Sequence, residues 1–203
     1  MQSNSIVVHV SGFPGSGKTT LGNKIQKMFK NKVVVFDTDG FIQPDTPEGK
    51  RLIKMETEFY SGKRTDWNEH RALWKATLKH KIEEFIAHHP NKVIVFVGSL
   101  DNFAPPNTIY PIDADYKFVL DVPLDQLMMR YFFRIYLGDK DVTAKQREDY
   151  WKKLAKGIYN IRGSDEIIRD HKKYEAWHKK HGYTFKTDQE IIRFVGNLMK
   201  KTI

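Results

Sequence analysis

The chain has 203 residues, no cysteine and a formal net charge of +9, with 40% hydrophobic and 29% charged residues. A chain of this length can bury a core of its own, and the absence of cysteine excludes disulfide frameworks, thiol nucleophiles and cysteine-ligated zinc. No signal-peptide pattern precedes the first apolar stretch, and no apolar run approaches the ~20 residues of a membrane span. We therefore expect a soluble, cytoplasmic protein that forms one domain over residues 1–203.

The apolar stretch 6–10 predicts a first β-strand, which leads into the run Gly12-Phe13-Pro14-Gly15-Ser16-Gly17-Lys18-Thr19. This run fits G-x-x-x-x-G-K-[ST], the phosphate-binding loop between a strand and a helix. Its glycines let successive backbone N–H groups converge on one anion, and the dipole of the following helix points at the same place. Lys18 is expected to neutralise β and γ oxygens, and the Thr19 hydroxyl to ligate Mg²⁺. The candidate nucleotide-binding residues are Gly12, Gly15, Ser16, Gly17, Lys18, Thr19 and Thr20.

The second predicted strand, 33–36, ends in two aspartates, Asp37 and Asp39. In an extended segment, residues two apart point to the same side. A carboxylate at the carboxyl end of a strand beside a phosphate-binding loop can reach a substrate hydroxyl or a Mg²⁺-bound water. The alternative is that these carboxylates only cap the turn at Asp39-Gly40.

Two helices are predicted between the second and third strands, in a segment that spans residues 44–90. Thr46 and Pro47 form an N-cap and a first-turn proline, Ser61-Gly62 ends that helix, and Asp66 with Glu69 is read as a capping pair that opens the next. Three arginines here are candidates to bind an acceptor phosphate, and three aromatics to stack a base, although such aromatics also serve as packing residues. These are Arg51, Arg64 and Arg71, and Tyr60, Trp67 and Trp74.

The third predicted strand, 93–97, is followed by a glycine and then by Asp101, without an acidic residue immediately at its end. This departure argues against a motor-type ATPase or GTPase, in which an acid at that position helps to hold the metal. Asp101 is a candidate to bind the acceptor, or else a turn residue. Prolines in the loop 101–115 predict that it lacks regular structure.

The fourth strand, 117–120, is followed by a helix that opens at Pro123 and carries Arg130 and Arg134 one turn apart. Arginines so placed can hold charge over a migrating phosphoryl group, or simply face solvent. Further helices are predicted after Thr143, after Ser164 and after Thr187, with a last strand at 183–185. From residue 124 onward there are 18 Lys and Arg against 11 Asp and Glu. This surplus suits polyphosphates or a nucleic acid, and a solvated lysine-rich helix explains it equally well.

The P-loop, the sequence Phe36-Asp37-Thr38-Asp39 and the arginine-bearing helix after the fourth strand resemble the nucleoside and nucleotide kinase group of P-loop proteins. The resemblance implies an α/β fold of three layers, α/β/α, with a five-stranded parallel sheet. It also implies ATP and Mg²⁺, an acceptor-binding helical insertion, a lid over 126–165, and adenine contacts near Thr187. In similar kinases an aspartate accepts the hydroxyl proton. We therefore predict Asp37 as the base and a metal-site residue and Asp39 as an acceptor ligand, with the two roles interchangeable on sequence evidence.

The predicted function is an ATP- and Mg²⁺-dependent phosphotransferase that moves the γ-phosphoryl group to a nucleoside, a nucleotide or a similar small acceptor. Two alternatives stay open. The basic C-terminal part suits a polynucleotide 5′-hydroxyl kinase, which would bind oligonucleotides in a salt-sensitive manner. The missing acid after the third strand suits a nucleotide-switched binding module or a slow NTPase.

Overall fold

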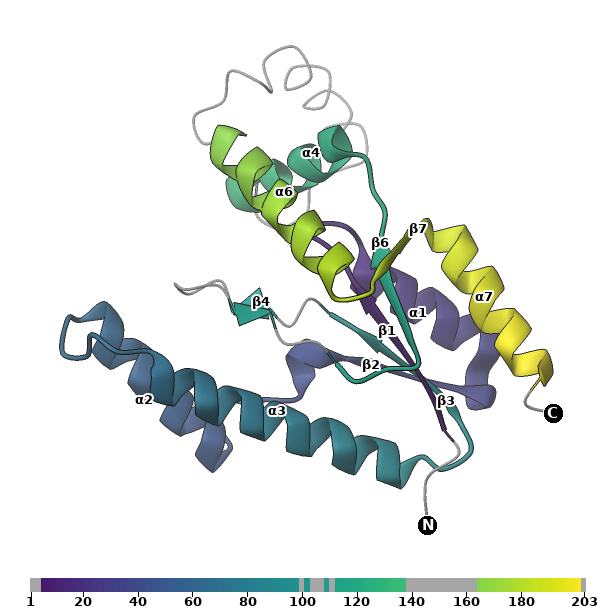
Figure 1. Cartoon of the computed structure of the whole chain (residues 1–203), viewed down its shortest axis with the longest axis horizontal. Helices are drawn as coiled ribbons and strands as arrows, with labels where there is room; N and C mark the ends of the chain where they lie inside the picture. The colour runs from purple at the N-terminus through teal and green to yellow at the C-terminus, as the bar shows by residue number, and fades with distance from the viewer. Residues whose placement is uncertain (1–4, 99–100, 103–107, 110–111, 138–163, 202–203) are drawn as a thin grey trace.

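The centre of the protein is a five-stranded parallel sheet with the strand order β2-β3-β1-β6-β7 (Figure 1). The computed structural model describes residues 5–98, 101–102, 108–109, 112–137 and 164–201. The strands are β1 (Ile6–Ser11), β2 (Val33–Asp37), β3 (Val93–Val97), β6 (Tyr116–Leu120) and β7 (Thr184–Lys186). Val10 of β1 lies opposite Val97 of β3 and Phe118 of β6. The predicted five-stranded parallel sheet is confirmed.

Helices cover both faces of this sheet, which makes three layers. Helices α1 (Lys18–Phe29) and α7 (Asp188–Lys201) pack on one face, where Val8 and Val10 of β1 meet Ile191 and Val195. The opposite face carries α3 (Asn68–His88) and α6 (Ser164–Lys180). Strands buried on both faces need apolar residues at nearly every position, and β3 is a run of five buried apolar residues.

The segment between β2 and β3 forms a 3₁₀ turn, η2 (Thr38–Gly40), and two helices that lie side by side, α2 (Pro47–Tyr60) and α3 (Figure 1). The Thr46 hydroxyl accepts a hydrogen bond from the Gly49 N–H at 3.1 Å, so α2 begins at the predicted N-cap. The remaining elements are η1 (Lys30–Lys32), β4 (Asp101–Asn102), β5 (Thr108–Ile109) and α4 (Leu124–Leu137).

Two local predictions are wrong. Asp66 does not form a capping box with Glu69: its carboxylate accepts from the Asn68 N–H at 2.9 Å, and Trp67 is the N-cap of α3. Glu69 binds two arginines instead, because α2 brings Arg51 within reach. The loop 101–115 also contains regular structure, since β4 and β5 pair as an antiparallel ladder. The helix predicted after Thr143 and most of the predicted lid lie outside the described residues.

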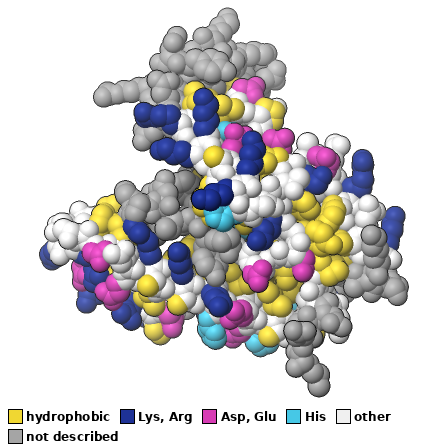
Figure 2. All heavy atoms as spheres, viewed as in Figure 1, with side chains coloured by type: hydrophobic (Ala, Val, Ile, Leu, Met, Phe, Trp, Pro, Cys, Tyr) yellow, Lys and Arg dark blue, Asp and Glu magenta, His cyan; other side chains and the backbone are white. Residues whose placement is uncertain are grey.

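The described surface carries its positive charge in scattered groups. Figure 2 shows Lys and Arg side chains over the region of α6, with acidic side chains between them. Within the described ranges, no helix combines the length and the apolar character that crossing a membrane requires.

Candidate active site

The P-loop joins β1 to α1 and has the backbone geometry of an anion-binding turn. Gly15 and Gly17 have φ values of 81° and 94°, which residues with a side chain rarely adopt. The Lys18 ammonium lies over the loop and donates to the carbonyl oxygens of Gly12 at 2.7 Å and Phe13 at 3.3 Å. A polyphosphate that entered the loop would offer this ammonium stronger, charged acceptors than these carbonyls.

A cavity of about 710 Å³ opens between the P-loop, the start of α4 and the start of α7. Arg130 of α4 lines it, and its Nη1 donates to the Ser16 carbonyl at 3.1 Å. Thr187 also lines it and forms a capping box with Glu190, whose carboxylate accepts from the Thr187 N–H at 2.8 Å. We call this the donor cavity. Its lining residues are Gly15, Ser16, Gly17, Thr20, Leu21, Lys24, Leu120, Asp121, Val122, Pro123, Gln126, Arg130, Thr187 and Asp188.

The end of β2 meets the start of α1 at a pair of oxygen ligands. The Thr19 hydroxyl donates to Asp37 Oδ2 at 2.7 Å, and Asp37 Oδ1 accepts from the Asp39 N–H at 3.2 Å. Hydroxyl and carboxylate oxygens suit Mg²⁺, which proteins usually hold through one or two residues together with water and substrate phosphates. In the described part of the chain there is no group of three or more His, Asp or Glu residues able to hold a metal by themselves. Thr19 and Asp37 therefore fit a metal that binds with a nucleotide.

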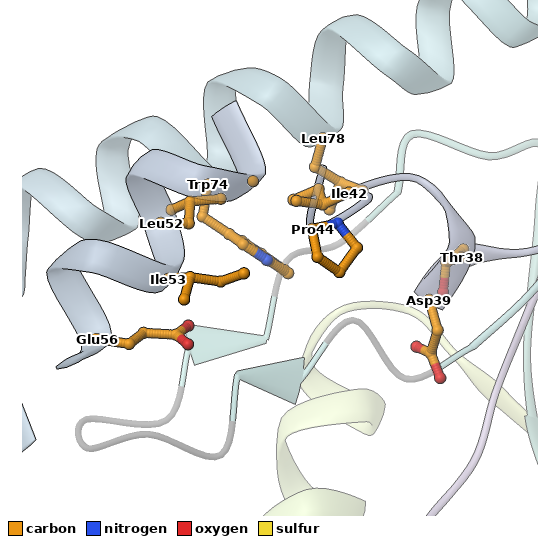
Figure 3. A pocket seen from close by; sticks show the side chains of 10 residues that line it. Thr38, Asp39, Ile42, Pro44, Leu52, Ile53, Glu56, Trp74 and Leu78 are labelled. Carbon is orange, nitrogen blue, oxygen red and sulfur yellow. The ribbon is translucent and has the colours of Figure 1, made fainter. Parts of the chain in front are cut away.

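A second cavity, of about 300 Å³, lies between η2, α2 and α3 (Figure 3). Apolar side chains of both helices form most of its wall, and Asp39 and Glu56 lie toward opposite ends of it. We call this the acceptor cavity, because Asp39 links it to the P-loop edge of the sheet. Its lining residues are Thr38, Asp39, Ile42, Pro44, Gly49, Leu52, Ile53, Glu56, Trp74 and Leu78.

Behind the P-loop, β1 carries a buried chain of hydrogen bonds. His9 Nε2 donates to the Gly98 carbonyl at 3.0 Å, which leaves Nδ1 to accept from the Tyr183 hydroxyl at 2.6 Å. His178 Nδ1 donates to the Tyr174 carbonyl, so its Nε2 accepts from the Ser11 hydroxyl at 2.9 Å. Burial lowers the pKa of His9 to about 3 and that of His178 to about 4, and both imidazoles are therefore neutral near pH 7.

The whole structure is similar to a solved shikimate kinase. The match is to the enzyme from Bacteroides thetaiotaomicron, with a TM-score of 0.50 and 20% sequence identity over 96% of this chain and 98% of that one. This chain has the same α/β fold, with a five-stranded parallel sheet and helices on both faces. No protein-family model matches it, and no curated protein matches it in sequence. At this identity the likeness establishes the fold, and the reaction has to be argued from the site.

Within this fold, two of the three arginines predicted to bind an acceptor phosphate are in ion pairs. Arg51 contacts Glu69 at 2.7 Å, and Arg64 contacts Glu69 at 3.0 Å and Glu58 at 3.4 Å. None of the arginines Arg51, Arg64 and Arg71 lines either cavity described above. Trp67 is buried and stacks on Phe59, with ring centroids 4.4 Å apart. The acceptor-binding roles of these four residues stay predictions.

The structure places the other predicted residues in one of the two cavities or elsewhere on α4 and β4. Thr20, Thr187 and Arg130 line the donor cavity, and Asp39 lines the acceptor cavity. Arg134 lies in α4 and Asp101 in β4, at positions where the structure describes the backbone alone. Sequence reasoning missed Glu56, although it follows Leu52 by one helical turn and so places a carboxylate beside the apolar stripe of α2.

Proposed function

We propose that the protein is an ATP- and Mg²⁺-dependent phosphotransferase that transfers the γ-phosphoryl group to a small hydroxyl-bearing acceptor. The observation that carries this proposal is the pair of cavities that approach the edge where β2 and the P-loop meet. The donor cavity contains the anion-binding loop, and the acceptor cavity ends at Asp39, two residues beyond Asp37. A phosphate at the first and a hydroxyl at the second would approach each other across Asp37 and Thr19.

The residues support distinct roles in this reaction. Lys18 and Arg130 would bind phosphate oxygens and stabilise the charge that develops on the transferred group. Thr19 and Asp37 would hold Mg²⁺, which when bound neutralises charge on the phosphates. Sequence reasoning gave the base role to Asp37, with Asp39 as the alternative. We assign it to Asp39, because Asp39 lines the acceptor cavity whereas Asp37 is not among the residues that line it.

The proposed reaction transfers one phosphoryl group and one proton. The acceptor oxygen forms a bond to the γ-phosphorus, the bond from that phosphorus to the bridging oxygen of ADP breaks, and the hydroxyl proton passes to the Asp39 carboxylate. The fold neighbour is named a kinase, which agrees with a phosphoryl transfer to a small molecule.

The test is γ-phosphoryl transfer from labelled ATP with Mg²⁺ to a panel of nucleosides, nucleoside monophosphates, small alcohols and a 5′-hydroxyl oligonucleotide. We expect transfer to one small-molecule class, and its loss in both Asp39→Asn and Asp37→Asn. If Mg²⁺ is held by Asp37, raising its concentration should partly rescue Asp37→Asn and leave Asp39→Asn unchanged. ATP binding without transfer to any acceptor would overturn the proposal in favour of a nucleotide-switched binding module, and transfer to the oligonucleotide alone would favour a polynucleotide kinase.

A further inference from the structure

The acceptor cavity has an unusual charge for a site that would receive a phosphorylated or carboxylated molecule. Its described polar side chains are the carboxylates of Asp39 and Glu56 and the hydroxyl of Thr38, and no Lys, Arg or His is among the described residues that line it. The other lining side chains are apolar, with Trp74 between the two acidic ends (Figure 3). An anionic group placed here would lie near two carboxylates, with no basic side chain among the described residues of the lining.

Glu56 is held in place by His70. His70 Nε2 lies 3.0 Å from Glu56 Oε1, and the imidazole is fully buried on α3 against the Trp67 ring, with centroids 4.3 Å apart. A carboxylate only accepts, so Nε2 carries the proton and donates it. Burial lowers the pKa of His70 below its ordinary range, and a neutral imidazole orients Glu56 without neutralising it.

Two arginines of the insertion are engaged elsewhere. Arg51 and Arg64 pair with Glu69, and Arg64 pairs also with Glu58. Both arginines lie outside the lining of the acceptor cavity. Thr38 is 4% exposed, and its hydroxyl oxygen lies against Gly98 with no hydrogen-bond partner among the described atoms.

We propose that the acceptor is a compact alcohol that carries an N–H donor, with its hydroxyl at Asp39, its nitrogen at Glu56 and its hydrocarbon part against Trp74. A protonated amine or an amino-substituted ring has this chemistry, whereas a phosphate or a carboxylate does not. A carboxylate binds N–H donors through charge-assisted hydrogen bonds, and an indole face attracts a cation. The volume of about 300 Å³ is at the lower end for ligand pockets, which suits a small acceptor. This inference rests on the proposed phosphotransferase function.

The test compares acceptors that differ in one group. Aminobutanol is paired with hydroxybutanoate, cytidine with its analogue that lacks the 4-amino group, and cytidine with cytidine monophosphate, and kcat/KM is measured for each with saturating ATP and Mg²⁺. We expect the member that has an amino group and no carboxylate or phosphate to be preferred by about tenfold or more. The aminobutanol and cytidine pairs separate a protonated amine from a ring amino group.

The variant Glu56→Gln should raise the KM for the preferred acceptor about tenfold, leave the KM for ATP unchanged and reduce the preference within each pair. Glu58→Gln is the matched control, because Glu58 lies on the same helix and pairs with Arg64 outside the cavity. Thermal melting of both variants is measured to check that they fold. A preference for hydroxybutanoate, the analogue without the amino group or the monophosphate, or an equal effect of Glu56→Gln on acceptors with and without the amino group, would overturn the inference while leaving the kinase intact. ATP binding with no transfer to any of these acceptors would count first against the proposed function.

Discussion

The donor cavity depends mainly on the backbone, whereas the acceptor cavity depends on side chains. The donor cavity depends on backbone, since consecutive residues of the P-loop supply its N–H groups and two glycines supply the positive φ angles. The acceptor cavity depends on side chains from η2, α2 and α3, up to 40 positions apart between Thr38 and Leu78. The proposed nucleotide site is therefore a local property of the sequence, whereas the proposed acceptor site depends on how the helices pack.

The largest expected effect falls on the donor side. Lys18→Ala should lower kcat/KM by about a thousandfold, because a buried, charge-assisted contact to the transferred phosphoryl group is lost. Transfer kinetics with the preferred acceptor measure this effect. Lys27→Ala, on the last turn of α1, is the control and should be close to the unmodified protein. If Lys18→Ala raised only the KM for the acceptor, the assignment of the two cavities would have to be exchanged.

A glycine offers a test on the acceptor side. A Cβ at Gly49 would overlap the backbone carbonyl of Gln43, which cannot rotate away as a side chain could. Gly49→Ala should therefore shift η2 against α2, lower the free energy of unfolding by about 2 kcal/mol and raise the KM for the acceptor more than that for ATP. Urea unfolding and steady-state kinetics measure these changes. Gly196→Ala, where a Cβ would make ordinary contacts with Phe29, should be neutral or stabilising.

Arg130 tests how far the donor cavity relies on a side chain as well as on backbone. Its guanidinium donates to the Ser16 carbonyl, so Arg130→Gln removes a cation at the edge of the P-loop. We expect kcat/KM to fall about ten- to a hundredfold, with the acceptor preference unchanged. Arg169→Gln, on the exposed surface of α6, serves as the control. An altered acceptor preference in Arg130→Gln would contradict the separation of the two cavities.

The smallest expected effect is a pH dependence of the free energy of unfolding, which comes from the buried histidines behind the P-loop. His9 lies on β1, the strand that leads into the P-loop, and binds the carbonyl oxygen of Gly98. Gly98 in turn lies beside Thr38 of the acceptor cavity. Its pKa is lowered from the ordinary 6.5 to about 3, so between these values the unfolded chain binds more protons than the folded one. The free energy of unfolding should then fall as the pH drops from 7 toward 4, with His178 acting in the same sense.

The midpoints of urea unfolding, measured from pH 7 to pH 4, test this decrease in the free energy of unfolding. His9→Gln should reduce the slope with pH, and His178 should maintain part of it. A steeper slope in His9→Gln would show that the buried imidazole is not what makes the fold sensitive to acid.

The contrast between local patterns and helix packing also explains which predictions from the sequence are confirmed. The five strands and the P-loop follow from patterns a few residues long, and the structure has all five strands in a parallel sheet. The Thr187 and Glu190 capping box is equally local and is present. Asp66 and Glu69 have the same pattern, but Glu69 is bound by Arg51 and Arg64, and the predicted capping box does not form. A local pattern therefore failed where a charged group from another helix competed for the same carboxylate.

The acceptor cavity could not be predicted in this way. Trp67 and Trp74 look alike in sequence, yet Trp67 is buried against Phe59 and Trp74 lines the cavity, because the pairing of α2 with α3 determines which ring is enclosed. Glu56 likewise acquires its place from His70, fourteen residues later on the neighbouring helix. Contacts between helices depend on the whole packing arrangement, which no short pattern encodes.

The buried hydrogen bonds behind the P-loop also limit how the molecule opens. Ser11 of β1 binds His178 and Tyr174 of α6, and both bonds lie in the interior. To move α6 away from the sheet, these polar groups would have to separate together and without water to replace their partners. Amide hydrogens of β1 and of the second half of α6 should therefore exchange with solvent as a single cooperative unit, at rates close to those of global unfolding.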